Sequence, residues 1–434
     1  MRETGLRAAA AAVLSGLLIA PICAHAQDDA ARLLEQRTGE VVAVLQGKRD
    51  PADVFDARFL AAVPPEQLRT LAAKLTAQGG EVQGYKGFLR EKRGSATFTL
   101  RFAHAAAPAR IELNPAAPGK VSGFRIFALT PAGDSFEQID ADFADLHGKA
   151  GYAVFQLGED GGSPTLTHGR AADTRLAIGS TFKLYVLAAL TRQVQQGQRR
   201  WSDVVPVTGK SFPGGTIHNL PEGAPVTLHT LASLMISISD NSATDILVRL
   251  VGPEALEREV RLSGHAKPEA MLPILTTGEI FALKRQGKDA AQRYARAAPA
   301  QRAAQRAALD LSGVAEADPG EVFGHGPVAI EQAEWFASPA DLTRIMDDLR
   351  RLGSKEAFDI LAINPAMDNI TVKDWPYVGY KGGSEDGVIS MTWLLRGKTG
   401  AWSVVSGSWN DPNAVVDNDR FQTLMLRLAK LAGG

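Results

Sequence analysis

Strand-forming segments that lie far apart constrain the fold of this chain more than any other feature. Residues 152–155, 388–395 and 402–409 are rich in aromatic and β-branched side chains, and helical patterning dominates the long region between the first two of them. The chain then reaches a segment, from Phe421 to Leu431, whose apolar residues recur at helical spacing. We therefore expect distant segments to pair in one sheet that helices accompany.

A smaller unit precedes this region. A helix is predicted after Pro64-Pro65, and apolar residues alternate with polar ones along residues 96–102, as in a half-buried strand. We expect an N-terminal α+β domain at residues 27–135 and a second domain at residues 143–434. A curved-sheet cone like that of the steroid-isomerase group is the fold expected for the first domain, which has no cluster of histidines or carboxylates that suggests a site.

The N-terminus has the pattern of a secretory signal peptide. Two arginines precede an apolar stretch at residues 8–22, and Ala24-His25-Ala26 has the small-x-small pattern of a cleavage site. We expect residues 1–26 to be removed and the product to be secreted or periplasmic. Cleavage would also remove Cys23, the only cysteine, so neither a disulfide nor a thiol nucleophile is expected. The apolar stretch is shorter than the roughly 20 residues of a membrane-spanning helix, so no stable membrane anchor is expected.

Composition excludes several classes of function. The chain has 47 basic and 48 acidic residues with no long run of either sign, so no nucleic-acid partner is expected. Its 8 histidines are scattered without metal-ligand spacing, and no metal or organic cofactor is implied. Residues 284–308, rich in Ala, Arg and Gln, are predicted to form a solvated helix whose charge is an exposed face. The oligomeric state is left open.

The first motif is a serine and a lysine at S-x-x-K spacing, Ser180 and Lys183, which open an apolar run over residues 184–190. On a helix, residues three apart share a face. A lysine whose pKa is lowered by burial can then take the serine proton, and the helix N-terminus can stabilise an oxyanion. Alone the motif is weak, because about one match is expected by chance in a chain of this length.

The second motif, Ser239-Asp240-Asn241, lies at a predicted break between two helices. One interpretation is a simple helix N-cap, for which serine and aspartate are common. The functional interpretation is that the Ser239 hydroxyl relays a proton to the leaving group while Asn241 holds a substrate amide.

The third motif is Lys381-Gly382-Gly383-Ser384, on a strand predicted to begin at Tyr377. The glycines allow a substrate to approach the strand backbone. Lys381 can then attract a substrate carboxylate, and Ser384 can bind it through its hydroxyl or complete an oxyanion hole with its N–H. Lys398-Thr399-Gly400 also fits a K-T-G pattern, but it lies between two strand segments, and we interpret it as a hairpin turn.

These motifs, in this order, resemble the serine β-lactamases and penicillin-binding proteins, with their S-x-x-K, S-D-N and K-T-G elements. Residues 179–183 and 236–243 are similar to class A β-lactamase segments, and the spacing of the first two motifs matches that class. The whole layout is similar to the two-domain β-lactamase-like hydrolase encoded among clavulanic-acid biosynthesis genes. The resemblance covers about residues 145–434. It implies an α+β fold, with a five-stranded antiparallel sheet flanked by helices and an all-helical subdomain, beside the small N-terminal domain.

Two positions depart from the family pattern. Gly382 replaces the threonine of K-T-G, which removes a hydroxyl near the substrate carboxylate. Class A enzymes also carry a deacylating glutamate in an E-x-x-L-N segment, for which this chain has no match around Leu275. Glu269 and Glu279 flank that place. Glu279 is the candidate base for deacylation, with an ordinary capping or surface role as the alternative.

The expected function is that of a secreted serine hydrolase, class A-like, that acts through an acyl-enzyme on Ser180. β-Lactam hydrolysis, as in antibiotic resistance or β-lactam catabolism, is the first hypothesis, with a small carboxylate-bearing β-lactam or ester as the substrate. An esterase or a D,D-peptidase with weak β-lactam turnover is the alternative. A non-catalytic binding protein of the same fold is a further hypothesis, against which the complete set of motifs argues.

Overall fold

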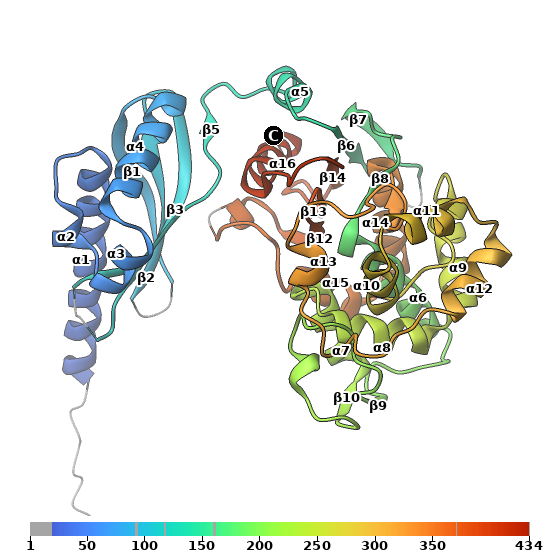
Figure 1. The fold of residues 1–434 in the computed structure, drawn as a ribbon. Coiled ribbons are helices and arrows are strands. Elements are labelled where there is room, and N and C mark those ends of the chain that lie inside the picture. The colour runs from blue at the N-terminus through green and yellow to red at the C-terminus, as the bar shows by residue number, and fades with distance from the viewer. Residues whose placement is uncertain (1–19, 92–93, 117–118, 159–161, 370, 434) are drawn as a thin grey trace, which may run out of the picture. The chain divides into compact units, whose positions relative to one another are not determined.

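A computed structural model describes residues 20–433, except residues 92–93, 117–118, 159–161 and 370 (Figure 1). Tertiary contacts divide the chain into two compact units, with the boundary between Ile126 and Phe127. Residues 1–19 of the predicted signal peptide lie outside the described residues, and its last seven residues begin helix α1. In the described part of the chain, no helix combines the length and the apolar character needed to cross a bilayer.

The N-terminal unit is an antiparallel sheet with helices. Its strands follow the order β1-β2-β3-β4, and the predicted helix after Pro64-Pro65 and strand at residues 96–102 are both present. Ala96, Phe98 and Leu100 are fully buried, as the alternating pattern requires. The elements are α1 (Ala20–Leu45), α2 (Pro51–Val54), α3 (Ala57–Ala62), α4 (Pro65–Gly79), β1 (Val82–Arg90), β2 (Ser95–Phe102), β3 (Ala105–Leu113) and β4 (Val121–Ile126).

The second unit is built on a five-stranded sheet with the order β12-β13-β14-β6-β7, in which every neighbouring pair is antiparallel. The strand predicted from residues 152–155 therefore pairs with a strand about 250 residues later, as Ala153 opposite Ser406 illustrates. The strands are β6 (Lys149–Gln156), β7 (Thr165–Arg170), β12 (Tyr377–Glu385), β13 (Val388–Arg396) and β14 (Trp402–Asn410). Outside this sheet, the chain has the short strands β5 (Thr130–Pro131), which pairs with β3, and β8 (Leu176–Ala177), β9 (Val204–Pro206), β10 (Pro225–Thr227) and β11 (Phe336–Ala337).

Helices cover both faces of this sheet because its central strands are apolar on both sides. Trp393 and Val405 pack in a cluster with α5 (Phe136–Ala144) and α16 (Asn418–Ala432). Their neighbours Leu394 and Val404 point the other way, into a cluster that includes α14 (Pro339–Leu352). The side-chain period of two thus divides the core into two layers.

Further helices form an all-helical part, and most of them share the second of these clusters. They are the 3₁₀ helix η2 (Gly179–Phe182), followed by α6 (Lys183–Gln195), α7 (Leu228–Ser237), α8 (Asn241–Val251), α9 (Pro253–Leu262), α10 (Thr277–Arg285), α11 (Lys288–Arg296), α12 (Pro299–Ala307), α13 (Gly320–Phe323) and α15 (Lys355–Ala362). The expected fold class is confirmed: an antiparallel five-stranded sheet flanked by helices, an all-helical part and a small N-terminal α+β unit.

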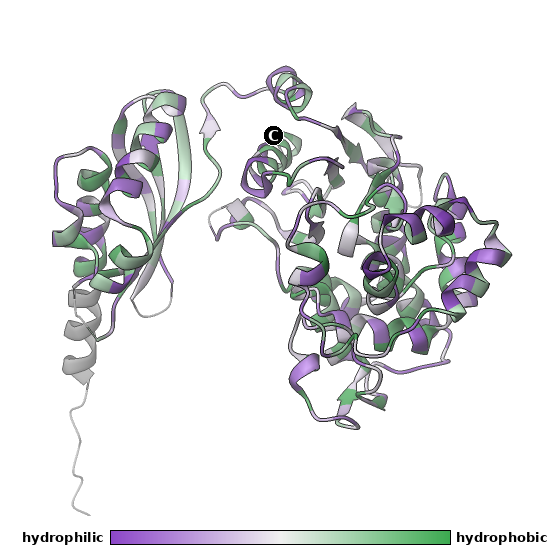
Figure 2. Ribbon diagram, viewed as in Figure 1, coloured by the Kyte–Doolittle hydropathy of each residue, from purple (hydrophilic) through white to green (hydrophobic). Residues whose placement is uncertain are grey.

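The prediction of one helix over residues 284–308 was wrong. Two helices, α11 and α12, replace it, because Gly287 with a φ of 87° precedes the first and Pro299 begins the second. Hydrophilic colouring predominates on both in Figure 2, in agreement with an exposed charged face. Lys284 differs, because its side chain is fully buried at the end of α10.

Candidate active site

Ser180 and Lys183 lie at the start of one continuous helical segment, η2 followed by α6. Gly179 begins the turn with a φ of 47°, a left-handed conformation that glycine adopts without strain. The Phe182 ring, between the two motif residues, stacks on Trp335 with a centroid distance of 3.9 Å. Lys183 begins a helix whose first nine residues are all buried, so its ammonium group lies inside the protein.

Ser239-Asp240-Asn241 joins α7 to α8, as predicted. Asp240 is the N-cap of α8, where Oδ1 accepts a hydrogen bond from the Ala243 backbone N–H at 2.9 Å. Its Oδ2 accepts from the backbone N–H groups of Thr216 and Ile217, at 2.6 and 2.8 Å. Asp240 therefore has a structural role, because it caps α8 and binds the backbone at residues 216–217. These bonds fix the backbone between Ser239 and Asn241.

A glycine pair that the sequence analysis missed packs against this motif. The Asn241 N–H donates to the Gly214 carbonyl at 3.0 Å. A Cβ atom on Gly215 would lie 2.3 Å from Asp240 Oδ2, so no side chain fits there. The signal in the sequence is Pro213-Gly214-Gly215, a turn-forming run without an assigned role.

Ser239 adopts a left-handed backbone conformation, with a φ of 60°. This conformation costs an L-residue roughly 1–2 kcal/mol. We therefore predict that Ser239→Gly is more stable than Ser239→Ala by about 1 kcal/mol, because both variants lack the hydroxyl and only glycine relieves the strain. Urea unfolding of the two variants measures the difference, and equal midpoints would contradict the prediction.

Two buried lysines converge on the Ser239 hydroxyl. Lys183 Nζ lies 3.0 Å and Lys381 Nζ 3.1 Å from Ser239 Oγ. Lys183 also donates to the Ser239 carbonyl at 2.7 Å and to Asn241 Oδ1 at 3.1 Å. Burial lowers the pKa of Lys183 to about 7, although the Asp245 and Asp240 carboxylates act in the opposite direction. Burial, together with the charge of Lys183, holds the pKa of Lys381 well below its usual value. A neutral amine is therefore available next to this serine near pH 7.

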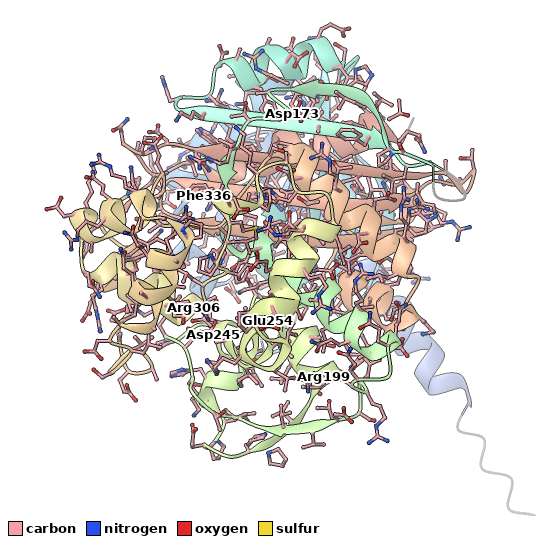
Figure 3. The ribbon with its side chains drawn as sticks, turned by 90° about the vertical axis from the view of Figure 1, so that its right-hand side faces the viewer. Asp173, Arg199, Asp245, Glu254, Arg306 and Phe336 are labelled. Atoms are coloured by element: carbon pink, nitrogen blue, oxygen red, sulfur yellow. The ribbon has the colours of Figure 1, made fainter. Side chains whose placement is uncertain are left out.

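Asp245 connects this site to the next helix. It lies on α8, one turn after Asn241, and is labelled in Figure 3. Its Oδ1 accepts from the Thr277 N–H at 2.7 Å and its Oδ2 from the Gly278 N–H at 2.9 Å, at the N-terminus of α10. Burial raises the pKa of this carboxyl. The sequence analysis missed Asp245, although its position four residues after Asn241 places both on one helix face.

Strand β12 brings Lys381 and Ser384 to the serine turn. It is the outermost strand of its sheet, so the turn at η2 can lie along its free edge. A Cβ atom on Gly383 would lie 2.4 Å from the Ser180 nitrogen, and one on Gly179 would lie 3.2 Å from the Ser384 nitrogen. Glycine at these positions therefore allows the backbone N–H groups of Ser180 and Ser384 to approach one another. The competing Lys398-Thr399-Gly400 lies in the turn between β13 and β14, as expected.

A cavity of about 630 Å³ joins the three motifs. Ser180, Ser239, Asn241, Lys381 and Ser384 all line it. Further lining residues that the sequence analysis did not identify include Gly214, Gly215, Asn364, Tyr380, Met391, Asn418 and Gln422. Among the described residues, no Asp or Glu lines this cavity. Nor does any group of three His, Cys, Asp or Glu side chains within the described chain have an arrangement that could hold a metal ion.

Glu279 is engaged in a helix cap. Its Oε2 accepts a hydrogen bond from the Thr276 N–H at 2.7 Å, while the Thr276 hydroxyl accepts from the Glu279 N–H at 3.1 Å. Its Oε1 lies 2.8 Å from Nε of Arg306, a residue of α12 that Figure 3 labels. Both carboxylate oxygens thus have protein partners, and Glu279 is not one of the residues that line the cavity. The other flanking acid, Glu269, pairs with Arg261 at 2.9 Å in an exposed position.

Comparison with known proteins identifies one family. A family model described as the Beta-lactamase enzyme family matches residues 135–362. A β-lactamase from Sphaerobacter thermophilus is similar in structure at 21% identity and a TM-score of 0.47, over 69% of this chain and 97% of that one. A β-lactamase from Chitinophaga pinensis gives 17% identity and a TM-score of 0.45, over 69% and 98%. A mutant of PBP-A, in an acyl-enzyme complex with penicillin G, gives 16% and 0.45, over 68% and 96%. No curated protein matches the sequence.

Proposed function

Because this chain belongs to the Beta-lactamase enzyme family, we propose that it is a serine hydrolase that forms an acyl-enzyme on Ser180 with carboxylate-bearing β-lactams or esters. The observation that carries the proposal is the hydrogen-bonded array of Lys183, Ser239 and Lys381 beside the cavity that Ser180 lines. A binding protein has no need of two buried amines on one serine hydroxyl, since each lysine costs free energy to bury.

Acylation begins when Lys183, as the neutral amine, takes the Ser180 proton. The Ser180 oxygen forms a bond to the substrate carbonyl carbon, and the carbonyl oxygen becomes an oxyanion. The N–H groups of Ser180 and Ser384 donate hydrogen bonds to it in this proposal. The close packing of Gly179 and Gly383 between strand and turn supports that role.

Ser239 then delivers a proton to the leaving nitrogen or oxygen. Its hydroxyl gives up its own proton and regains one from the protonated Lys183, which lies within hydrogen-bond distance. The bond between the carbonyl carbon and the leaving group breaks, and the acyl group stays on Ser180. Asn241 is proposed to hold a substrate amide, while Lys381 and the Ser384 hydroxyl hold the carboxylate.

Deacylation is proposed to be slow. A water molecule must lose a proton as it attacks the acyl-enzyme, and no carboxylate of the described chain lines the cavity to accept it. Glu279, the base suggested by the sequence, has both oxygens occupied by a cap and an ion pair. We therefore favour an acylating enzyme with weak β-lactam turnover over an efficient β-lactamase.

Time-resolved intact mass of the protein mixed with benzylpenicillin tests the proposal. We expect the mass of the intact drug to be added to the protein, and to be lost over minutes or longer because no base activates water. Ser180→Ala should give no adduct. Absence of an adduct and of turnover in the wild-type protein would overturn the function, whereas fast turnover without an adduct would overturn slow deacylation.

Export is proposed from the sequence pattern at Ala24-His25-Ala26. The same mass measurement, on protein expressed with its N-terminus intact, gives the first residue of the mature chain, which we expect to be Gln27.

A further inference from the structure

Tyr380 occupies the space that a side chain at position 382 would need. Both residues lie on β12 two positions apart, so they share one face of the strand. A Cβ atom built on Gly382 would lie 2.1 Å from the Tyr380 hydroxyl oxygen and 2.8 Å from Cζ. The hydroxyl group that the strand presents at this point therefore comes from residue 380.

Ring packing holds the Tyr380 side chain in position. The ring packs on Trp393 of the neighbouring strand, with a centroid distance of 5.0 Å and an interplanar angle of 37°. Tyr380 lines the same cavity as Ser180 and Lys381. Within the part of the chain that the structure describes, its hydroxyl makes no hydrogen bond with protein. Burial raises the pKa of this phenol, so it remains a neutral donor at physiological pH.

The position favours a negatively charged partner. Tyr380 and Lys381 are successive residues of β12, so their side chains leave opposite faces of this edge strand, and both line the cavity. A substrate carboxylate beside Gly382 has two oxygens, and each of them can accept a hydrogen bond. Lys381 supplies one donor, and the unpaired phenol supplies another on the other side.

We propose that Tyr380 is a specificity-determining residue that donates its hydroxyl to the substrate carboxylate beside Lys381. The proposal rests on the proposed function at Ser180. Tyr380 thereby selects carboxylate-bearing substrates over neutral analogues of the same shape, and Gly382 is required because any larger residue displaces the phenol.

The test compares benzylpenicillin with its methyl ester, which lacks the negative charge. Acylation of Ser180 is followed by intact mass, and kcat/KM for acylation is measured for both compounds. For Tyr380→Phe we expect kcat/KM for the acid to fall about tenfold or more, as for a lost hydrogen bond to a charged group, and that for the ester to change less than about twofold. A merely structural role would lower both rates together.

A second pair of variants relocates the hydroxyl. Tyr380→Ala opens the space at Gly382, and threonine or valine is then introduced there. These two residues have the same shape and differ in a hydroxyl, so Tyr380→Ala/Gly382→Thr should recover a preference for the acid that Tyr380→Ala/Gly382→Val does not. Equal acid-to-ester ratios in wild type and Tyr380→Phe would overturn the inference. Failure of both compounds to acylate the wild type would instead overturn the proposed function.

Discussion

Replacing Lys183 with arginine is expected to slow acylation of Ser180 by about 1000-fold, although the variant keeps a positive charge at this position. The proposed role of Lys183 requires its neutral form, which burial makes available by lowering its pKa to about 7. Arginine does not lose its proton at any accessible pH, so it cannot accept the proton of serine. General-base catalysis contributes typically about 10²–10⁴-fold, which sets the size of the effect.

The pH dependence of the acylation rate is a second test of the role of Lys183. Below about pH 7 Lys183 is protonated and cannot act as a base, and above it the neutral amine dominates. The acylation rate of the wild-type protein should therefore rise with pH through about 7 and then level off. The rate of Lys183→Arg should be flat across that range.

Lys381→Arg is the matched control, because the proposed role of Lys381 is to hold a substrate carboxylate, and an arginine side chain can also do this. We expect it to retain acylation within about tenfold of wild type. If Lys183→Arg kept the acylation rate and Lys381→Arg lost it, the roles of the two lysines would be the reverse of those proposed. Melting temperatures of both variants show whether either substitution disturbs the fold.

Local patterns predicted the local structure around the candidate site residues. The S-x-x-K spacing requires that Ser180 and Lys183 share a helix face, and the helical segment bears this out. Two helical faces around Ser239 predicted the turn between α7 and α8. The sheet followed from composition, because segments rich in aromatic and β-branched residues lie at both ends of a mostly helical region, and these distant segments pair with one another.

Individual side-chain contacts between distant segments were beyond such patterns. The approach of Lys381 to Ser239 joins residues that are 142 positions apart. The crowding of Gly382 by Tyr380 depends on the rotamer of one ring, which no local pattern specifies. The local composition around Lys284 predicts a solvated charged face, because its partners, Glu334 and Glu385, are 50 and 101 residues away.

These three residues form a buried ion cluster in which Lys284 Nζ contacts Oε1 of both Glu334 and Glu385. The side chains of Lys284 and Glu334 are fully buried. Burial, and then the proximity of Glu334, hold the pKa of Glu385 well above its usual value. Glu385 directly follows Ser384 on β12, so the cluster anchors the end of the strand that carries the proposed carboxylate site.

Lys284→Met is therefore expected to lower the free energy of unfolding by about 3–5 kcal/mol, because it leaves the buried Glu334 and the partly buried Glu385 without their cation. Lys288→Met, an exposed lysine at the start of α11, is the control and should stay within about 0.5 kcal/mol of wild type. Adding Glu334→Gln and Glu385→Gln to Lys284→Met removes the uncompensated charge and should recover at least half of the loss. Urea unfolding near pH 7 measures all of these variants. A change in Lys284→Met no larger than that in Lys288→Met would mean that the cluster adds nothing to stability, and β12 would then need another anchor beside Ser384.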